Sequence, residues 1–205
     1  MKAISFPTLL LAGTVAALAL SAVGPHDRLT WLLEVAPVLI ALPILILTRQ
    51  SFPLTHLLYG FMGLHGLILI IGGHYTYAEV PPGFWVRDAL ELSRNPYDRL
   101  GHFAQGFVPA LLAREILIRR SPLAASRWLS VVVVSICLAF SAFYEMLEWW
   151  AAIGLGQSAE QFLGTQGDQW DTQWDMFLAL VGAIALVLLL SKIHDQRLQS
   201  LGKAR

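Results

Sequence analysis

Six long apolar runs alternate with short polar segments along the chain. They cover residues 7–24, 31–48, 54–73, 98–118, 128–150 and 174–191. A transmembrane helix needs about 20 mostly apolar residues, and each run has close to that length. The prolines inside these runs do not argue against helices, since membrane helices tolerate proline. The pattern predicts an all-α, polytopic membrane helix bundle of about six transmembrane helices, forming a single integral membrane domain over residues 1–205.

The first run has a second interpretation, as a cleaved signal peptide. Lys2 precedes an apolar stretch that ends in small residues near ALALSAVG, which is the order of features in a signal peptide. The small residues extend through the whole run, however, and the basic region before it holds a single charge. We therefore expect an uncleaved span, with cleavage as the alternative.

The composition supports the membrane class. The chain of 205 residues is 56% hydrophobic and 14% charged, whereas a soluble domain carries about 25% charged residues. The formal net charge is zero and no basic patch stands out, which argues against a nucleic-acid partner. The single cysteine, Cys137, excludes a disulfide within one chain. Membrane lipids are the partner that this composition predicts.

The distribution of lysine and arginine predicts the orientation. With a cytoplasmic N-terminus, ten of these residues fall in inner segments: Lys2, Arg49, Arg114, Arg119, Arg120, Arg127, Lys192, Arg197, Lys203 and Arg205. The outer segments hold four, which are Arg28, Arg87, Arg94 and Arg99. Basic residues concentrate on the cytoplasmic side of membrane proteins, so we expect both termini in the cytoplasm.

Acidic residues and one histidine gather at the predicted outer ends of the last three runs. In chain order these runs contribute Asp98 and His102, Glu145 and Glu148, and Asp168, Asp171 and Asp175. Spacings of three and four residues place neighbours on one helical face. Three segments therefore deliver carboxylates and an imidazole to one depth. Glu34 and His74 lie at the same end, as either pocket members or local structural residues.

The acids of this cluster outnumber the nearby bases, and isolated charges in the bilayer are costly. Three arrangements could relieve the excess. A divalent metal ion could bind, the carboxyl groups could retain shared protons, or the acids could pair with outer-loop arginines such as Arg94 and Arg99. The candidate metal ligands are Asp98, His102, Glu145, Glu148, Asp171 and Asp175. His102 and Glu145 are the candidate catalytic acid and base.

Each of these residues also has an ordinary structural interpretation. Asp98 could cap the first turn of its helix and orient His102. Glu145 and Glu148 could be solvated at an interfacial helix end, and Asp168 and Asp171 could complement the dipole of a helix N-terminus. Asp175 is followed directly by MFLALVGAIALVLLL, so it lies deepest in the apolar layer and fits a solvated role least well.

These polar segments resemble a known family. The runs DRLGHFAQGFVPALLAREIL, YEMLEWW and GDQWDTQWDM, with HYTYAEVPPGFW upstream, resemble the YjdF family of bacterial inner-membrane proteins over nearly the whole chain. The resemblance implies a multi-pass protein of the bacterial inner membrane. The biochemical function of that family is unassigned, so the resemblance implies no reaction.

A more distant resemblance is to VanZ-like membrane proteins, whose pattern begins with an Asp-Lys-x-x-His-Phe helix start. Here DRLGHF supplies Asp98 and His102, with Arg99 in place of the lysine. Glu145 or Glu148 would then match the glutamate of the next helix, and Asp171 or Asp175 the aspartate of the last element. The sequence departs from the pattern at Met176 and Leu178, where an asparagine would be expected. The resemblance implies a VanZ-like helical core with a polar pocket.

The sequence supports three functional hypotheses. The leading one is an enzyme that carries out a metal-assisted or acid/base reaction on a lipid-linked or amphipathic substrate from the outer leaflet. The second is a proton- or cation-coupled transporter that uses the acids as a relay. The third is a non-catalytic accessory protein of the cell envelope.

Overall fold

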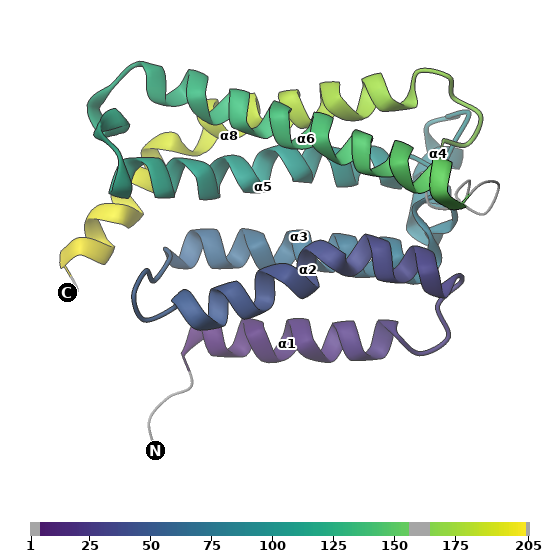
Figure 1. Cartoon of the computed structure of the whole chain (residues 1–205), viewed down its shortest axis with the longest axis horizontal. Helices are drawn as coiled ribbons and strands as arrows, with labels where there is room; N and C mark the ends of the chain where they lie inside the picture. Colours follow the sequence, from purple (N-terminus) through teal and green to yellow (C-terminus); the bar gives the residue numbers. More distant parts are fainter. Residues whose placement is uncertain (1–4, 156–164, 204–205) are drawn as a thin grey trace.

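The computed structural model describes residues 5–155 and 165–203, and within them the chain is helical. The helices, in chain order, are α1 (Phe6–Ser21), α2 (Arg28–Thr48), α3 (His56–Tyr75), η1 (Tyr77–Glu79), α4 (Pro81–Ala89), α5 (Tyr97–Arg120), η2 (Pro122–Ala125), α6 (Trp128–Leu155) and α8 (Asp171–Lys203). Six of them are long and lie side by side (Figure 1).

Each of the six predicted runs coincides with one of these long helices, with some differences at the ends. The sixth helix extends furthest beyond its prediction, since α8 continues twelve residues past residue 191. The short helix α4 lies in a segment to which the sequence assigned no helix. By length and hydropathy, the four helices α2, α3, α6 and α8 can cross a membrane, whereas α1 is an apolar helix of 16 residues. The long helix α5 begins with the polar sequence YDRLGH.

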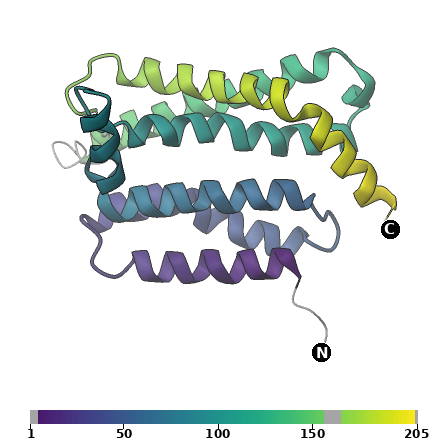
Figure 2. The same ribbon diagram turned by 180° about the vertical axis from the view of Figure 1, so that it is seen from behind.

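The long helices form two groups of three, as Figures 1 and 2 show. In the first group α3 packs against both α1 and α2, and in the second α5, α6 and α8 pack against one another. The two groups meet where α3 contacts α5. Both ends of the described chain lie at one end of the bundle, and α4 lies across the other (Figure 1).

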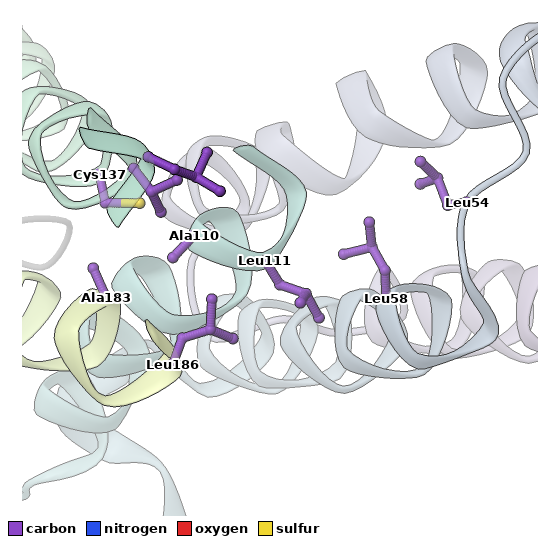
Figure 3. Close-up of a cluster of buried hydrophobic side chains, with 9 residues drawn as sticks. Leu54, Leu58, Ala110, Leu111, Cys137, Ala183 and Leu186 are labelled. Atoms are coloured by element: carbon purple, nitrogen blue, oxygen red, sulfur yellow. The ribbon is translucent and has the colours of Figure 1, made fainter. Parts of the chain in front are cut away.

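The main apolar core lies where α3, α5, α6 and α8 meet (Figure 3). Leu58, Leu111 and Leu186 are fully buried there, next to Ala110 and Ala183. Between helices in a bilayer, such side chains stabilise the fold through close packing, because lipid is as apolar as leucine.

Helices α5 and α8 cross with their backbones in direct contact, and two glycines allow this approach. A Cβ atom on Gly106 would lie 1.8 Å from the carbonyl oxygen of Ala179. A Cβ atom on Gly182 would lie 2.2 Å from the carbonyl oxygen of Phe103. Small residues at a crossing of this kind are typical of membrane helix pairs. The crossing fixes how the polar start of α5 lies against the polar start of α8.

Candidate functional site

Two reciprocal hydrogen bonds between Asn95 and Gln166 anchor the start of α5. The Asn95 backbone N–H donates to Gln166 Oε1 at 2.9 Å, and Gln166 Nε2 donates to the Asn95 carbonyl oxygen at 3.1 Å. The Asn95 side chain also donates to the Val80 carbonyl oxygen and accepts from the Tyr97 backbone N–H. These bonds join the segment before α4, the start of α5 and the segment before α8, so the side chains of the following turn are held in place.

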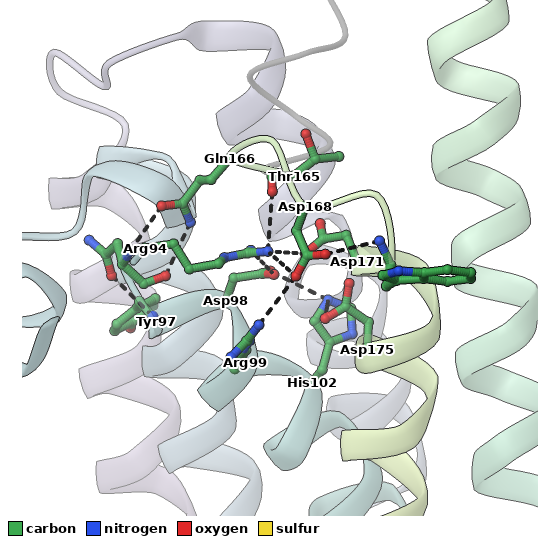
Figure 4. Close-up of polar contacts among 12 residues, drawn as sticks. Arg94, Tyr97, Asp98, Arg99, His102, Thr165, Gln166, Asp168, Asp171 and Asp175 are labelled. Atoms are coloured by element: carbon green, nitrogen blue, oxygen red, sulfur yellow. Dashed lines mark hydrogen bonds and ion pairs between the residues drawn. The ribbon is translucent and has the colours of Figure 1, made fainter. Parts of the chain in front are cut away.

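The side chains of Asp98, His102 and Asp175 lie close together, next to these hydrogen bonds (Figure 4). His102 Nε2 lies 3.4 Å from Asp98 Oδ1 and 3.7 Å from Asp175 Oδ1. One ligand atom from each of the three residues lies within 4.8 Å of the other two, and all three side chains are buried. Of the predicted metal ligands, these three therefore form the closest group among the described residues. Asp98, His102 and Asp175 are called the triad below.

The other nitrogen of His102 faces Gln105, one helical turn further along α5. His102 Nδ1 lies 2.9 Å from Gln105 Oε1, a distance and partner that suit donation from an Nδ1–H group. That tautomer leaves the Nε2 lone pair facing Asp98 and Asp175. A carbonyl or carboxylate partner on the second nitrogen is also what metal-binding histidines generally have.

Arg94 is the main counter-ion of the acidic cluster. Its guanidinium pairs with Asp171 Oδ1, lies 3.2 Å from Asp98 Oδ2 and donates to the Thr165 carbonyl oxygen at 3.1 Å. Figure 4 shows its side chain extending between α5 and α8. Sequence analysis treated Arg94 only as one of several loop arginines. Its position four residues before Asp98 was the available signal.

Asp168 and Arg99 form a second, more exposed layer. Arg99 Nη2 lies 3.3 Å from Asp168 Oδ2, and the guanidinium lies 5.3 Å from the ring centroid of Trp174. Asp168 Oδ1 accepts from the Trp170 backbone N–H at 2.9 Å, so this carboxylate also stabilises the turn before α8. Asp168 and Asp171 are thus paired with outer-loop arginines, as one of the three predicted arrangements required. Among the described residues, Asp175 forms no ion pair with an arginine.

Helix α6 contributes Glu145, Glu148 and Ser141, all buried. Glu145 Oε1 lies 3.9 Å from His102 Nδ1, beyond hydrogen-bonding distance. Among the described residues, Glu145 Oε1, Asp175 Oδ1 and Ser141 Oγ are buried atoms with no hydrogen-bond partner. Buried carboxylate oxygens without a partner are costly, so their presence here is a feature that needs a cause.

Glu34 of α2 and Tyr77 of η1 line the site from the first group of helices. Both are buried, and the Glu34 carboxyl group lies near Tyr77 and Asp98. Burial, together with the nearby Glu34 carboxylate, raises the pKa of the Tyr77 hydroxyl well above its usual value, so Tyr77 stays neutral. Sequence analysis did not single out Tyr77. His74, the other residue left open, bonds to the Ser21 carbonyl oxygen at 2.9 Å and so joins α3 to the end of α1.

A second buried polar cluster lies at the opposite end of α5 and α8. Its centre is Glu115, whose two carboxylate oxygens accept hydrogen bonds from the Thr55 backbone N–H and hydroxyl, from Arg119 Nη1 at 2.7 Å and from His194 Nε2 at 3.1 Å. Arg114 Nη1 lies 2.8 Å from His194 Nδ1, which leaves the ring proton on Nε2 for Glu115. His194 lies beyond the last predicted run, which ends at residue 191, and it is fully buried. We name this group the Glu115 cluster; its members are Glu115, His194, Arg114, Arg119 and Thr55.

The fold and the site are those of a multi-pass helical membrane protein with a buried, acid-rich cluster at one end of its bundle. The family model described as "Predicted membrane protein (DUF2238)" matches residues 6–196, and the chain belongs to this family. The chain is also 54% identical over 180 residues to the inner membrane protein YjdF of Escherichia coli strain K12. The aligned residues cover 88% of this chain and 86% of that protein. No solved structure matches the chain.

These findings support a protein of the bacterial inner membrane and confirm the resemblance to the YjdF family. They assign no reaction to it. The VanZ-like core and the cytoplasmic location of both termini stay predictions, as do the six predicted metal ligands and the two predicted catalytic residues.

Proposed function

We propose that this protein is a membrane enzyme in which Asp98, His102 and Asp175 bind a divalent metal ion, and that it acts on a lipid-linked or amphipathic substrate at the outer face of the inner membrane. The proposal includes six membrane crossings, by α1, α2, α3, α5, α6 and α8, with both termini cytoplasmic. The single observation that carries it is the spacing of the triad.

Two ligand atoms that each lie about 2.1 Å from one ion, at the tetrahedral angle, are about 3.4 Å apart. The distances of 3.4 and 3.7 Å from His102 Nε2 to the two aspartates fit that spacing. The same distances are too long for ordinary N–H···O hydrogen bonds, which are about 2.7–3.2 Å. The triad thus has a separation that suits a shared ion better than direct hydrogen bonds.

The ligand types and their surroundings also fit a metal. Two carboxylates and one imidazole suit a borderline or hard divalent ion such as Zn²⁺ or Mn²⁺. A cation there would give Asp175 Oδ1, now without a hydrogen-bond partner, a charge to bind. With three protein ligands, a metal keeps positions open for water or substrate and lowers the pKa of a bound water.

Glu145 is the residue we propose as the acid/base group. Its buried Oε1 atom has no hydrogen-bond partner among the described residues and lies 3.9 Å from His102 Nδ1. It is therefore close to the triad without being bound to any of its members. We assign Glu148 and Asp171 supporting roles, with Asp171 held by Arg94.

The surroundings of the site support an amphipathic substrate. Four tryptophans at this end of α6 and α8 are exposed, namely Trp149, Trp150, Trp170 and Trp174. Exposed tryptophans concentrate at membrane–water interfaces, where the head groups of amphipathic molecules lie. A substrate with its polar group at this depth would reach the triad from the interface.

The apolar core between the two polar clusters favours an enzyme over a proton or cation relay. Ala110, Leu111, Ala183 and Leu186 pack tightly along α5 and α8 between the triad and the Glu115 cluster. A relay needs a chain of polar groups or water across the membrane. Reconstitution in liposomes should therefore show no proton flux above that of empty liposomes.

Metal analysis of the purified protein tests the proposal. The full chain, isolated with an affinity tag free of histidine, should retain about one equivalent of a divalent metal or bind it on titration. His102→Ala and Asp175→Asn should each lose this binding. Asp88→Asn is the matched control, because Asp88 is an exposed acid at the same end of the bundle and should leave binding unchanged. Absence of metal binding, or equal loss in the control, would refute the metal site.

A further inference from the structure

A cavity of about 250 Å³ lies between the two groups of helices, apart from the candidate site. It is enclosed by α1, α2, α3 and α5, and its wall is almost entirely apolar, including Leu10, Leu42, Met62 and Val108. Its volume is slightly below the range of about 300–1,000 Å³ typical of small-molecule pockets. Exposed Ile46 is part of the wall, so the cavity reaches the outer surface of the helices.

Two prolines and two glycines lie in the wall of the cavity. Pro37 and Pro109 line it from α2 and α5, where each proline removes a backbone hydrogen bond of its helix. From α3, Gly63 and Gly66 line it, and a Cβ atom at Gly63 would lie 3.3 Å from the Leu10 side chain. The apolar wall that these helices form suits a chain-like apolar ligand.

Two polar groups mark one end of the cavity, while Thr14 and His65 line it further along α1 and α3. Arg49, at the end of α2, and Tyr59, in the first turn of α3, both line it on the side of the bundle where the termini lie. Within residues 5–155 and 165–203, neither side chain makes a hydrogen bond or ion pair. Arg119, a neighbouring arginine on this side, is by contrast engaged with Glu115 and the Pro53 carbonyl oxygen.

We propose that this cavity binds one anionic phospholipid of the cytoplasmic leaflet, with an acyl chain between the helix groups and the phosphate at Arg49. The apolar wall suits the chain, and the guanidinium and the Tyr59 hydroxyl suit the phosphate oxygens. This lipid site lies at the opposite end from the triad. It does not depend on the proposed enzymatic reaction, but its place in the cytoplasmic leaflet rests on the proposed orientation of the helices.

Native mass spectrometry of the delipidated full chain in detergent tests the proposal. Phosphatidylglycerol should bind at one copy per chain, and phosphatidylcholine with the same acyl chains should bind at least about fivefold more weakly. Arg49→Gln should remove that preference. Arg127→Gln is the matched control, because Arg127 is exposed on the same side but does not line the cavity, and it should keep the preference.

A second variant fills the cavity. Ala41→Phe places a ring in the wall and should weaken phosphatidylglycerol binding by about fivefold or more, while Arg49→Gln covers the case in which this variant fails to fold. Inorganic phosphate alone should not compete with phosphatidylglycerol, since the acyl chain of the lipid provides most of the contact with the cavity. The proposal is overturned if both lipids bind equally, if Arg49→Gln and Arg127→Gln behave alike, or if inorganic phosphate displaces the lipid.

Discussion

The two ends of the α5–α8 pair hold buried polar clusters that differ in how fully their polar atoms are hydrogen-bonded. In the Glu115 cluster, both carboxylate oxygens of Glu115 and both ring nitrogens of His194 have partners. At the other end, Asp175 Oδ1 and Glu145 Oε1 are buried and have no hydrogen-bond partner in the part of the chain that the structure describes. The same helix pair therefore carries one completed network and one incomplete network.

The difference separates a structural cluster from a functional one. A fully satisfied buried network rigidifies the fold, whereas an incomplete one lowers its stability unless something else binds. Functional sites are where proteins commonly accept such a local cost. We infer that the Glu115 cluster joins α3, α5 and α8, and that the acid-rich end is arranged for a ligand.

The largest expected effect is at the centre of the completed network. Glu115→Gln removes the charge that Arg119 and His194 share, and removing one partner of a buried ionic network typically costs about 3–5 kcal/mol. We expect a clear fall in the thermal unfolding temperature in detergent, with metal binding at the triad retained in the folded fraction.

The exposed acid Glu91 supplies the control for this change, since Glu91→Gln should leave the unfolding temperature within error. A Glu115→Gln protein as stable as the wild type would mean that the Glu115 cluster does not hold the helices together. The contrast between the two ends would then be wrong.

The next effect concerns the crossing that connects the two clusters. Gly106→Ala places a methyl group against the Ala179 carbonyl oxygen, so α5 and α8 must separate. Overpacking of this kind costs about 1–3 kcal/mol, and the separation should also weaken metal binding by moving Asp175 away from His102. Thermal unfolding and metal titration of one preparation would measure both effects.

Gly13→Ala is the matched control for the glycine change. Nothing lies within 4 Å of a Cβ atom at Gly13, so this substitution should keep or raise stability, by up to about 1 kcal/mol, through helix propensity alone. Equal stability of the two alanine variants would contradict the direct backbone contact.

The smaller third effect differs in sign from the first. Asp175→Asn replaces a buried carboxyl group whose Oδ1 atom has no hydrogen-bond partner among the described residues, so without divalent metal the variant should be as stable as the wild type or more stable by about 1 kcal/mol. Asp171→Asn, by contrast, breaks the pair with Arg94 and should lower stability, since hydrogen bonds to charged groups contribute about 1.5–3 kcal/mol. Unfolding curves recorded with a chelator would compare the two variants, and a lower stability of Asp175→Asn would place Asp175 with the structural acids.

The sequence predicted much of this arrangement, for reasons that individual residues make clear. Hydropathy located all six long helices, because an apolar run of the right length is a local property. Helical spacing placed Asp98 with His102, and the topology brought Asp175 to the same end. The proximity of the three residues thus followed from the residue spacing within each helix and from the alternating direction of consecutive membrane spans.

The pairing inside the cluster could not be predicted in the same way. Which acid binds Arg94 depends on the register of α5 against α8, and that register depends on backbone contacts at Gly106 and Gly182. The burial of His194 depends equally on how the end of α8 packs against α5. The sequence shows neither kind of contact, because each joins residues 73 to 80 positions apart.

The smallest expected effect concerns Asp27, an acid at the same end as the triad whose partner is entirely local. Its carboxylate accepts from the Thr30 backbone N–H at 2.7 Å and caps α2, and this bond is the main cause that lowers the pKa of Asp27 below its usual value. Because the folded-state pKa is lowered, the cap stabilises the protein above the unfolded pKa of about 3.9 and is lost as the pH falls through the lower folded value.

Asp27→Ala should therefore cost at most about 1 kcal/mol at neutral pH and still less in acid. Asp27→Asn caps the helix without a titratable group, so it should match the wild type at neutral pH and lose the part of the acid dependence that belongs to this residue. Unfolding temperatures of the three proteins, measured from pH 7 down to about pH 3, would isolate the contribution of Asp27 to the acid dependence of stability. If Asp27→Asn keeps the full acid dependence, then the buried acids around the triad control the response to pH, and the contrast between the two ends of the bundle extends to their titration.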